Sequence, residues 1–165
     1  MRNFGMKRAL LGAAIAALAM NASAAHAATA TGTAKAKILR QITLTNTSDL
    51  QFATIISGAT ASTVAVSTAG AATCGSGLTC TGTTTAANFD IQGTSGAVVL
   101  VGGDSSVTLN GSLGGTMTAA LTYSATNVTL TATGGSFKVG GTLSVGANQA
   151  SGDYSGTFNV TANYQ

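Results

Sequence analysis

The chain has 165 residues, of which 7% are charged, and a formal net charge of +3. This excess lies in Arg2, Lys7 and Arg8, because without them 4 of the 7 Lys and Arg residues remain and balance the 4 Asp residues. A nucleic-acid-binding protein needs a basic face that displaces counterions from phosphates. We therefore do not expect nucleic acid as a partner.

Residues 1–27 have the pattern of a secretory signal peptide. A basic start is followed by the apolar residues 9–19 and by Ala25-His26-Ala27, a small-x-small cleavage site. Ala22-Ser23-Ala24 is a second such site, so the sequence leaves cleavage open between Ala24 and Ala27. The alternative is a retained membrane anchor, but a spanning helix needs about 20 apolar residues. We expect an exported chain with no transmembrane segment after cleavage.

The residue types needed for catalysis are scarce after residue 27. His26 is the only histidine and leaves with the signal peptide, and the chain has no Glu. Serine and cysteine nucleophiles need a neighbouring base, and zinc sites need grouped His and Cys ligands. A Ser-Lys pair that uses Lys138 is the one formal alternative. We expect no enzymatic activity, no metal and no cofactor.

Residues 28–165 predict a single all-β domain, because Thr and Val favour strands while Gly and Asn favour turns. Apolar residues recur with a period of two, and no helical period is present. The expected strands are residues 42–45, 50–56, 64–66, 89–91, 98–101, 107–109, 117–123 and 128–132. Two further short strands, around Val139 and Leu143, are separated by a break at Gly140 and Gly141. Many short strands with turn signals favour an immunoglobulin-like β-sandwich.

Cys74 and Cys80 flank a glycine-containing segment that interrupts the predicted strands. Exported proteins retain disulfides, and a short flexible loop allows closure. A redox or metal site is the alternative, but the Cys-x-x-Cys spacing and further ligands are missing. We predict a local structural disulfide.

The segment before the predicted domain alternates between small apolar and polar residues. Its apolar set is Ala30, Gly32, Ala34, Ala36 and Ile38. Such a segment is either the first strand of the domain or an extension that adds to the sheet of another molecule. We divide the chain into residues 28–38, a candidate donor strand, and residues 39–165, the sandwich.

The C-terminal segment is the clearest amphipathic stretch, and we expect residues 154–165 to form one strand. Tyr154, Gly156, Phe158, Val160, Ala162 and Tyr164 fall on one face. With Gly152 fourteenth from the end and Tyr164 penultimate, this stretch resembles the C-terminal strand of chaperone–usher pilus subunits. Residues 140–165 also resemble spore-coat-U-type domains and related uncharacterised pilin-like proteins.

The resemblance implies an incomplete immunoglobulin-like sandwich whose missing edge strand leaves a groove. A periplasmic chaperone first fills such a groove, and the N-terminal extension of the next subunit then replaces it at an outer-membrane usher. The resemblance assigns recognition of the C-terminal strand to Gly152, Tyr154, Phe158, Val160, Ala162 and Tyr164. It also implies a fimbrial location on the cell surface, reached through the periplasm.

Two functions follow from these patterns. In the first, the chain is a structural subunit of a cell-surface fibre, joined to other copies or related subunits by strand exchange. In the second, it is a self-complete secreted sandwich that binds a glycan or another surface ligand. An exposed aromatic platform would distinguish the second function from the first.

Overall fold

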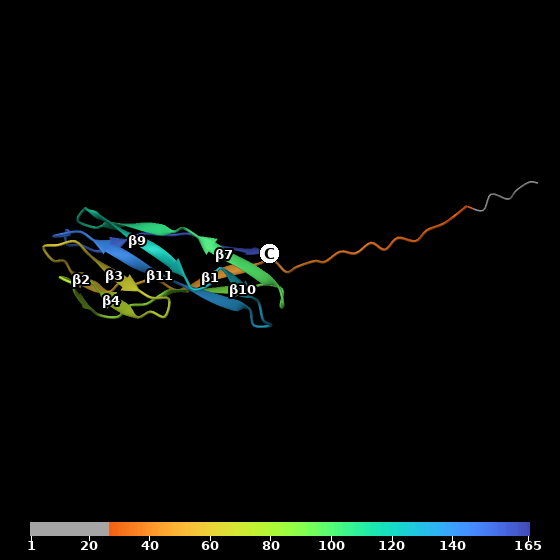
Figure 1. Ribbon diagram of the computed structural model, residues 1–165, viewed down its shortest axis with the longest axis horizontal. Helices are drawn as coiled ribbons and strands as arrows, with labels where there is room; N and C mark the ends of the chain where they lie inside the picture. The colour runs from red at the N-terminus through yellow and green to blue at the C-terminus, as the bar shows by residue number, and fades with distance from the viewer. Residues whose placement is uncertain (1–26) are drawn as a thin grey trace, which may run out of the picture. The chain divides into compact units, whose positions relative to one another are not determined.

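The computed structural model describes residues 27–165 (Figure 1). The predicted signal peptide therefore lies outside the described residues, apart from Ala27. Residues 27–42 contain no strand, turn or bend, and residues 27–38 are exposed. The folded body is the compact unit Lys37–Gln165. Within residues 27–165 there is no helix, and so none that is long and apolar enough to cross a membrane.

The body consists of short strands joined by turns. In chain order they are β1 (Thr43–Ser48), β2 (Thr54–Ile56), β3 (Ser62–Val66), β4 (Ala72–Cys74), β5 (Thr79–Thr81), β6 (Ala87–Gln92), β7 (Val98–Gly103), β8 (Ser106–Gly111), β9 (Thr116–Tyr123), β10 (Asn127–Thr129), β11 (Gly135–Val145), β12 (Tyr154–Ser155) and β13 (Val160–Tyr164).

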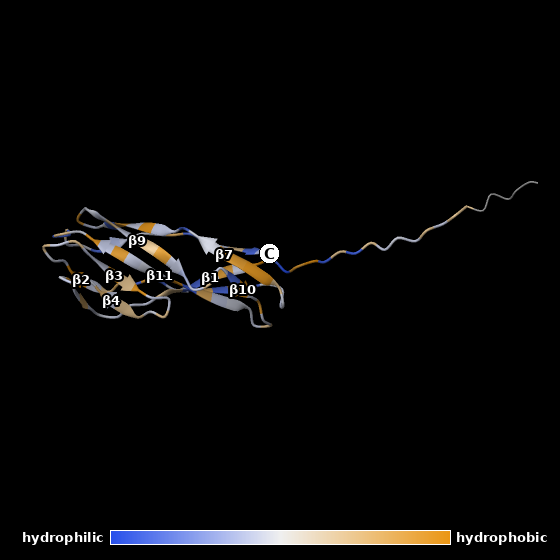
Figure 2. Cartoon of the chain, viewed as in Figure 1, coloured by the Kyte–Doolittle hydropathy of each residue, from blue (hydrophilic) through white to orange (hydrophobic). Residues whose placement is uncertain are grey.

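All strand pairs are antiparallel. The larger sheet has 8 strands, with the order β1-β6-β11-β9-β8-β12 and β3-β4 attached to β11. A second sheet has the order β10-β7-β13, and β2 pairs with β5. Ile91 of β6, Val99 of β7 and Val139 of β11 are fully buried in one cluster, so the two sheets pack face to face. Figure 2 shows the apolar character of β7 in orange. The prediction of an all-β sandwich is confirmed, and the arrangement is consistent with an immunoglobulin-like fold.

The predicted break at Gly140 and Gly141 is wrong, because β11 runs through both residues. Its first half pairs with β6 and its second half pairs with β3. A Cβ at Gly140 would collide with the carbonyl oxygen of Val66, and one at Gly141 would press on Leu50 and Phe52. The glycines therefore allow close packing within one long strand instead of ending it.

The predicted single strand over residues 154–165 is also wrong. Its first residues form β12, which pairs with β8 in the larger sheet, whereas β13 pairs with β7 in the smaller sheet. The crossing occurs at residues 156–159, where a Cβ on Gly156 would collide with the carbonyl oxygen of Thr108. The predicted alternation of side chains nevertheless persists, since Tyr154, Phe158 and the even-numbered residues of β13 are half-buried and their neighbours are exposed. Gly156 is the exception and is exposed.

Cys74 and Cys80 form the predicted disulfide, with their Cα atoms 6.0 Å apart. The segment around them is not a simple interruption, because Cys74 ends β4 and Cys80 is the middle residue of β5. Cys80 lies opposite Ile55 of β2. The disulfide thus links β5 to β4, and β2 is attached through its pairing with β5.

Replacing both cysteines by serine is expected to lower the free energy of unfolding by about 2 kcal/mol, since a short loop is no longer closed in the unfolded chain. Urea unfolding of the oxidised protein and the double variant measures this difference. A reductant should lower the stability of the unmodified protein by a similar amount and leave the variant unchanged. Equal stability of the oxidised unmodified protein and the double serine variant would contradict the assignment.

Candidate functional site

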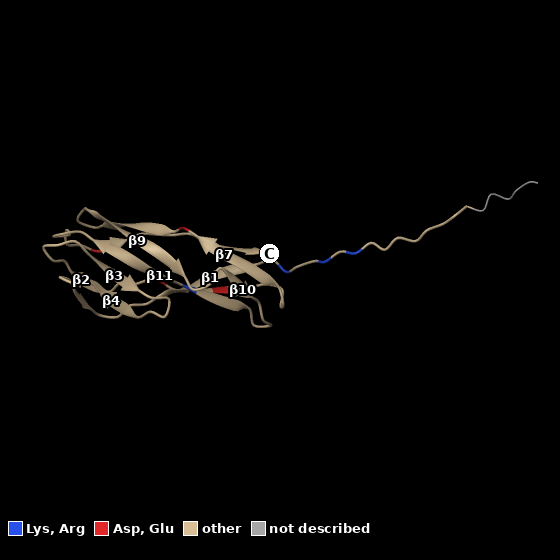
Figure 3. Ribbon diagram, in the orientation of Figure 1, with Lys and Arg blue, Asp and Glu red and all other residues tan. Residues whose placement is uncertain are grey.

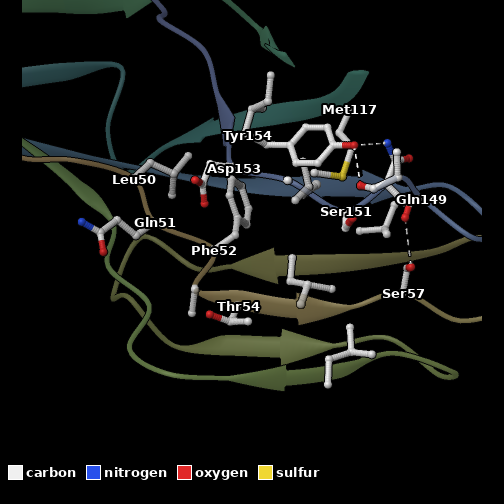
Figure 4. Close-up of a pocket in the computed structure, with 18 residues that line it drawn as sticks. Leu50, Gln51, Phe52, Thr54, Ser57, Met117, Gln149, Ser151, Asp153 and Tyr154 are labelled. Carbon is white, nitrogen blue, oxygen red and sulfur yellow. Dashed lines mark hydrogen bonds between the residues drawn. The ribbon is translucent and has the colours of Figure 1, made fainter. Parts of the chain in front are cut away.

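An open pocket lies between two segments of the body and has a volume of about 680 Å³ (Figure 4). One wall is formed by residues 50–57 and the other by residues 149–154. Between these walls the pocket is lined by apolar side chains of β8, β9 and β11: Leu109, Met117, Leu143 and Val145. Because Leu143 and Val145 belong to a core cluster, the pocket gives access to the apolar interior.

The first wall was predicted as a continuous strand over residues 50–56, and the structure corrects this. Only Thr54–Ile56 form a strand, while Gln51 makes an isolated bridge to Thr85. Between them Ala53 has a φ of 60°, a left-handed backbone that is strained for any residue with a Cβ. This bend lets Phe52 enter the core while Ile56 remains 59% exposed.

Replacing Ala53 by glycine is expected to raise the free energy of unfolding by about 0.5–1 kcal/mol, because glycine adopts a positive φ without strain. The larger entropy of glycine in the unfolded chain offsets part of this gain. Ala65→Gly in β3 is the control and should lower stability, since Ala65 is not among the residues with positive φ. Thermal or urea unfolding compares the three proteins. A loss of stability in both variants would argue against strain at Ala53.

The second wall is held by a hydrogen-bond network around Tyr154. The Tyr154 hydroxyl donates to the carbonyl oxygen of Ala150 over 2.7 Å and accepts from Nε2 of Gln149 over 2.8 Å. Ser57 donates to the carbonyl oxygen of Gln149 over 3.3 Å and so joins the two walls (Figure 4). Gly152 has a φ of 146°, a backbone conformation that favours glycine. The local backbone therefore accounts for a glycine at this position.

Beyond the pocket, the C-terminal segment continues into β13, whose outer edge pairs with no strand of residues 27–165. The amide of Gln165 donates to the carbonyl oxygen of Val98, and the amide of Asp104 donates to that of Asn159. Because hydrogen-bonding direction alternates along an antiparallel strand, Thr161 and Asn163 also face β7. The backbone groups of Val160, Ala162 and Tyr164 therefore point outward, at what we call the free edge.

Apolar side chains along the free edge are incompletely covered. Val160, Ala162 and Tyr164 are half-buried against the core, as are Ile42 and Leu44 at the start of the body. Phe158 packs against both core clusters and so connects the free edge with the pocket. An added strand would cover these side chains and satisfy the outward backbone groups at the same time.

The pocket and β13 carry little charge. Figure 3 shows acidic residues scattered singly over the body, whereas most of the basic residues lie on the segment before β1. Asp153 is the only charged residue that lines the pocket. Near the start of β13, burial and then the charge of Asp104 raise the pKa of Tyr123, whose hydroxyl donates to the Asp104 carbonyl oxygen. Within residues 27–165, His, Cys, Asp and Glu form no group that could hold a metal ion. The arrangement suits an apolar polypeptide better than a charged ligand.

The structure places the predicted C-terminal residues along one segment that runs from the pocket to the free edge. Gly152 and Tyr154 line the pocket, Phe158 lies between pocket and edge, and the predicted β13 residues form the edge itself. The candidate donor residues Ala30, Gly32, Ala34, Ala36 and Ile38 are exposed and in no strand, and Ile38 is 93% exposed. Their donor role stays a prediction.

Sequence reasoning missed the wall formed by residues 149–151 and the contributions of Leu109 and Met117. Leu109 and Met117 were expected only as ordinary strand residues, and the sequence carries no signal that both would open into a pocket.

A family model described as "Domain of unknown function (DUF4402)" matches residues 42–164. This match begins just before β1 and ends with β13, so it spans the sandwich. No curated protein and no solved structure matches the chain.

Proposed function

We propose that this chain, which belongs to the DUF4402 family, is a non-enzymatic structural subunit of a cell-surface fibre assembled by strand exchange. The observation that carries the proposal is the free edge of β13, which leads through Phe158 into a pocket open to the core. Unpaired strand edges are usually blocked by charge, proline or a covering segment. β13 itself carries neither charge nor proline, since its side chains are Val, Thr, Ala, Asn and Tyr, and no strand of residues 27–165 pairs with its outer side.

The occupant of the free edge is residues 28–38 of a second copy. These residues alternate with the period of a strand, and residues 28–38 are exposed in this chain. A donor strand gains affinity from main-chain hydrogen bonds and specificity from alternate side chains. Because four of the five inward residues are Ala or Gly, most of the affinity comes from the backbone.

The sizes of the side chains suggest an antiparallel register. The distance in sequence from Ala30 to Ile38 equals that from Tyr164 back to Gly156. With Ala30 opposite Tyr164, Ala34 lies opposite Val160, so small donor residues meet larger ones on β13. Ile38 then lies opposite Gly156, two residues beyond Tyr154 of the pocket wall.

Export, the periplasmic chaperone, the outer-membrane usher and the fimbrial location follow from the resemblance to pilus subunits and belong to this proposal. The surface supports the proposal over a glycan-binding module. All aromatic side chains of residues 27–165 are buried or half-buried, so they form no exposed stacking platform.

The test is an SDS gel of material sheared from producing cells, with an unheated sample beside a boiled one. The proposal predicts a ladder that collapses to one band on boiling, since strand exchange is non-covalent and slow to reverse. A single monomer band in both lanes would refute it.

A further inference from the structure

Three hydrogen bonds join the root of the N-terminal segment to the last strand; we call them the clasp. The Tyr164 hydroxyl donates to the carbonyl oxygen of Arg40 over 2.6 Å and accepts from the amide of Thr94 over 2.8 Å. The amide of Arg40 in turn donates to Oγ1 of Thr94 over 2.7 Å. Both backbone groups of Arg40 are therefore held, one by β13 and one by the β6–β7 connection.

The clasp lies at the end of the body where a self-docking chain would have to turn. Thr43 pairs with Gln92 at the end of β6, and Tyr164 pairs with Val99 near the start of β7. From this end β1 runs away into the body. For residues 28–38 to reach the free edge of their own β13, the chain would have to reverse direction between Ile38 and Thr43 and then lie parallel to β13.

The sequence and the clasp both oppose this reversal. Residues 38–42 are Ile-Leu-Arg-Gln-Ile and include none of the Gly, Pro, Asn or Asp residues that tight turns use. The structure has no turn or bend at these residues. A turn centred on residue 40 would also break the two backbone hydrogen bonds of Arg40.

We infer that Tyr164 is a positioning residue that, through the clasp, keeps the extension from docking on its own free edge and so directs it to a second copy. This inference rests on the proposed function, because it concerns which molecule fills the edge. A fibre subunit needs a preference for docking on a second copy over docking on itself. Its own extension is always present at a high effective concentration, and self-docking would end fibre growth.

The experiment compares full-length Tyr164→Phe with the unmodified protein in producing cells. The phenyl ring keeps the half-buried packing, while the hydroxyl is lost. We expect the ratio of monomer to ladder to rise at least fivefold, because the substitution removes both hydrogen bonds of the hydroxyl and the loss of one bond alone corresponds to about that factor. Trypsin gives the second readout, since Lys35 and Lys37 are exposed in the free extension and protected once it is docked. Monomers of the variant should resist cleavage there, whereas unmodified monomers should be cut.

Tyr123→Phe is the matched control, because its hydroxyl donates to the Asp104 carbonyl oxygen and is outside the clasp. It should leave the monomer ratio and the trypsin pattern unchanged. Thr94→Val removes the hydroxyl that accepts from the Arg40 amide and keeps the Thr94 amide that donates to Tyr164. It leaves β13 unchanged, and it should raise the monomer ratio and the trypsin resistance in the same direction as Tyr164→Phe. If Tyr164→Phe does not fold, Thr94→Val decides the matter.

An unchanged ladder in both clasp variants would overturn the inference, and so would extra monomers whose extension is still cut. The absence of a ladder from the unmodified protein would instead refute the proposed function.

Discussion

Ala34→Asp is expected to abolish the heat-sensitive ladder, whereas Thr33→Asp is expected to leave it in place. Ala34 faces inward in the proposed donor strand, and its side chain would lie against half-buried Val160. An aspartate there would be buried without a partner, which costs several kcal/mol. We expect at least a tenfold loss of oligomer, since about 1.4 kcal/mol already corresponds to a factor of ten.

Thr33→Asp adds the same charge one residue earlier, where the side chain of the docked donor strand would point to solvent. Both positions are exposed in the described chain, so neither aspartate should change the stability of the body. Urea unfolding of the monomers checks this equality. If the two variants lost the ladder equally, charge on the segment would be the cause and the inward face of the donor would be assigned wrongly.

The fold class could be predicted because its signals are local. Alternating Phe89 and Ile91 become buried residues of β6, and the continuous apolar run that starts at Val98 becomes β7 in the smaller sheet. The glycines misled the prediction for a physical reason. A glycine in a sequence indicates either a turn or a place where another backbone segment packs closely. Only the position of the neighbouring β3 shows that Gly140 allows close packing.

The candidate site could be predicted only in part. The alternation toward Tyr164 is visible in the sequence and identifies the residues of the free edge. The sequence does not show that residues 154–165 divide between two sheets. The division depends on the close packing of Gly156 against Thr108, and these residues lie far apart in sequence. The pocket likewise needs the positive φ of Ala53, which no propensity of alanine suggests.

The direction of the backbone groups on β13 allows a second test with a large effect. Ala162→Pro should leave the body folded and prevent its use as an acceptor. The amide of Ala162 points to the free edge, so proline removes no bond to β7, and prolines are tolerated on the outer side of edge strands. An incoming strand would lose a donor and meet the proline ring. We expect the ladder to disappear. The free energy of unfolding of the monomer, measured in urea, should change by no more than about 0.5 kcal/mol, as for a surface substitution.

Thr161→Pro is the matched control, because the Thr161 amide faces β7 and pairs opposite Gly102. Proline there removes a ladder bond and leaves a carbonyl unsatisfied, which should lower the free energy of unfolding by about 1–3 kcal/mol. The two variants differ by one position and separate acceptor function from stability. If Ala162→Pro unfolded the body while Thr161→Pro did not, the outward direction assigned to Ala162 would be wrong. A normal ladder from Ala162→Pro would show that the subunits join at another surface.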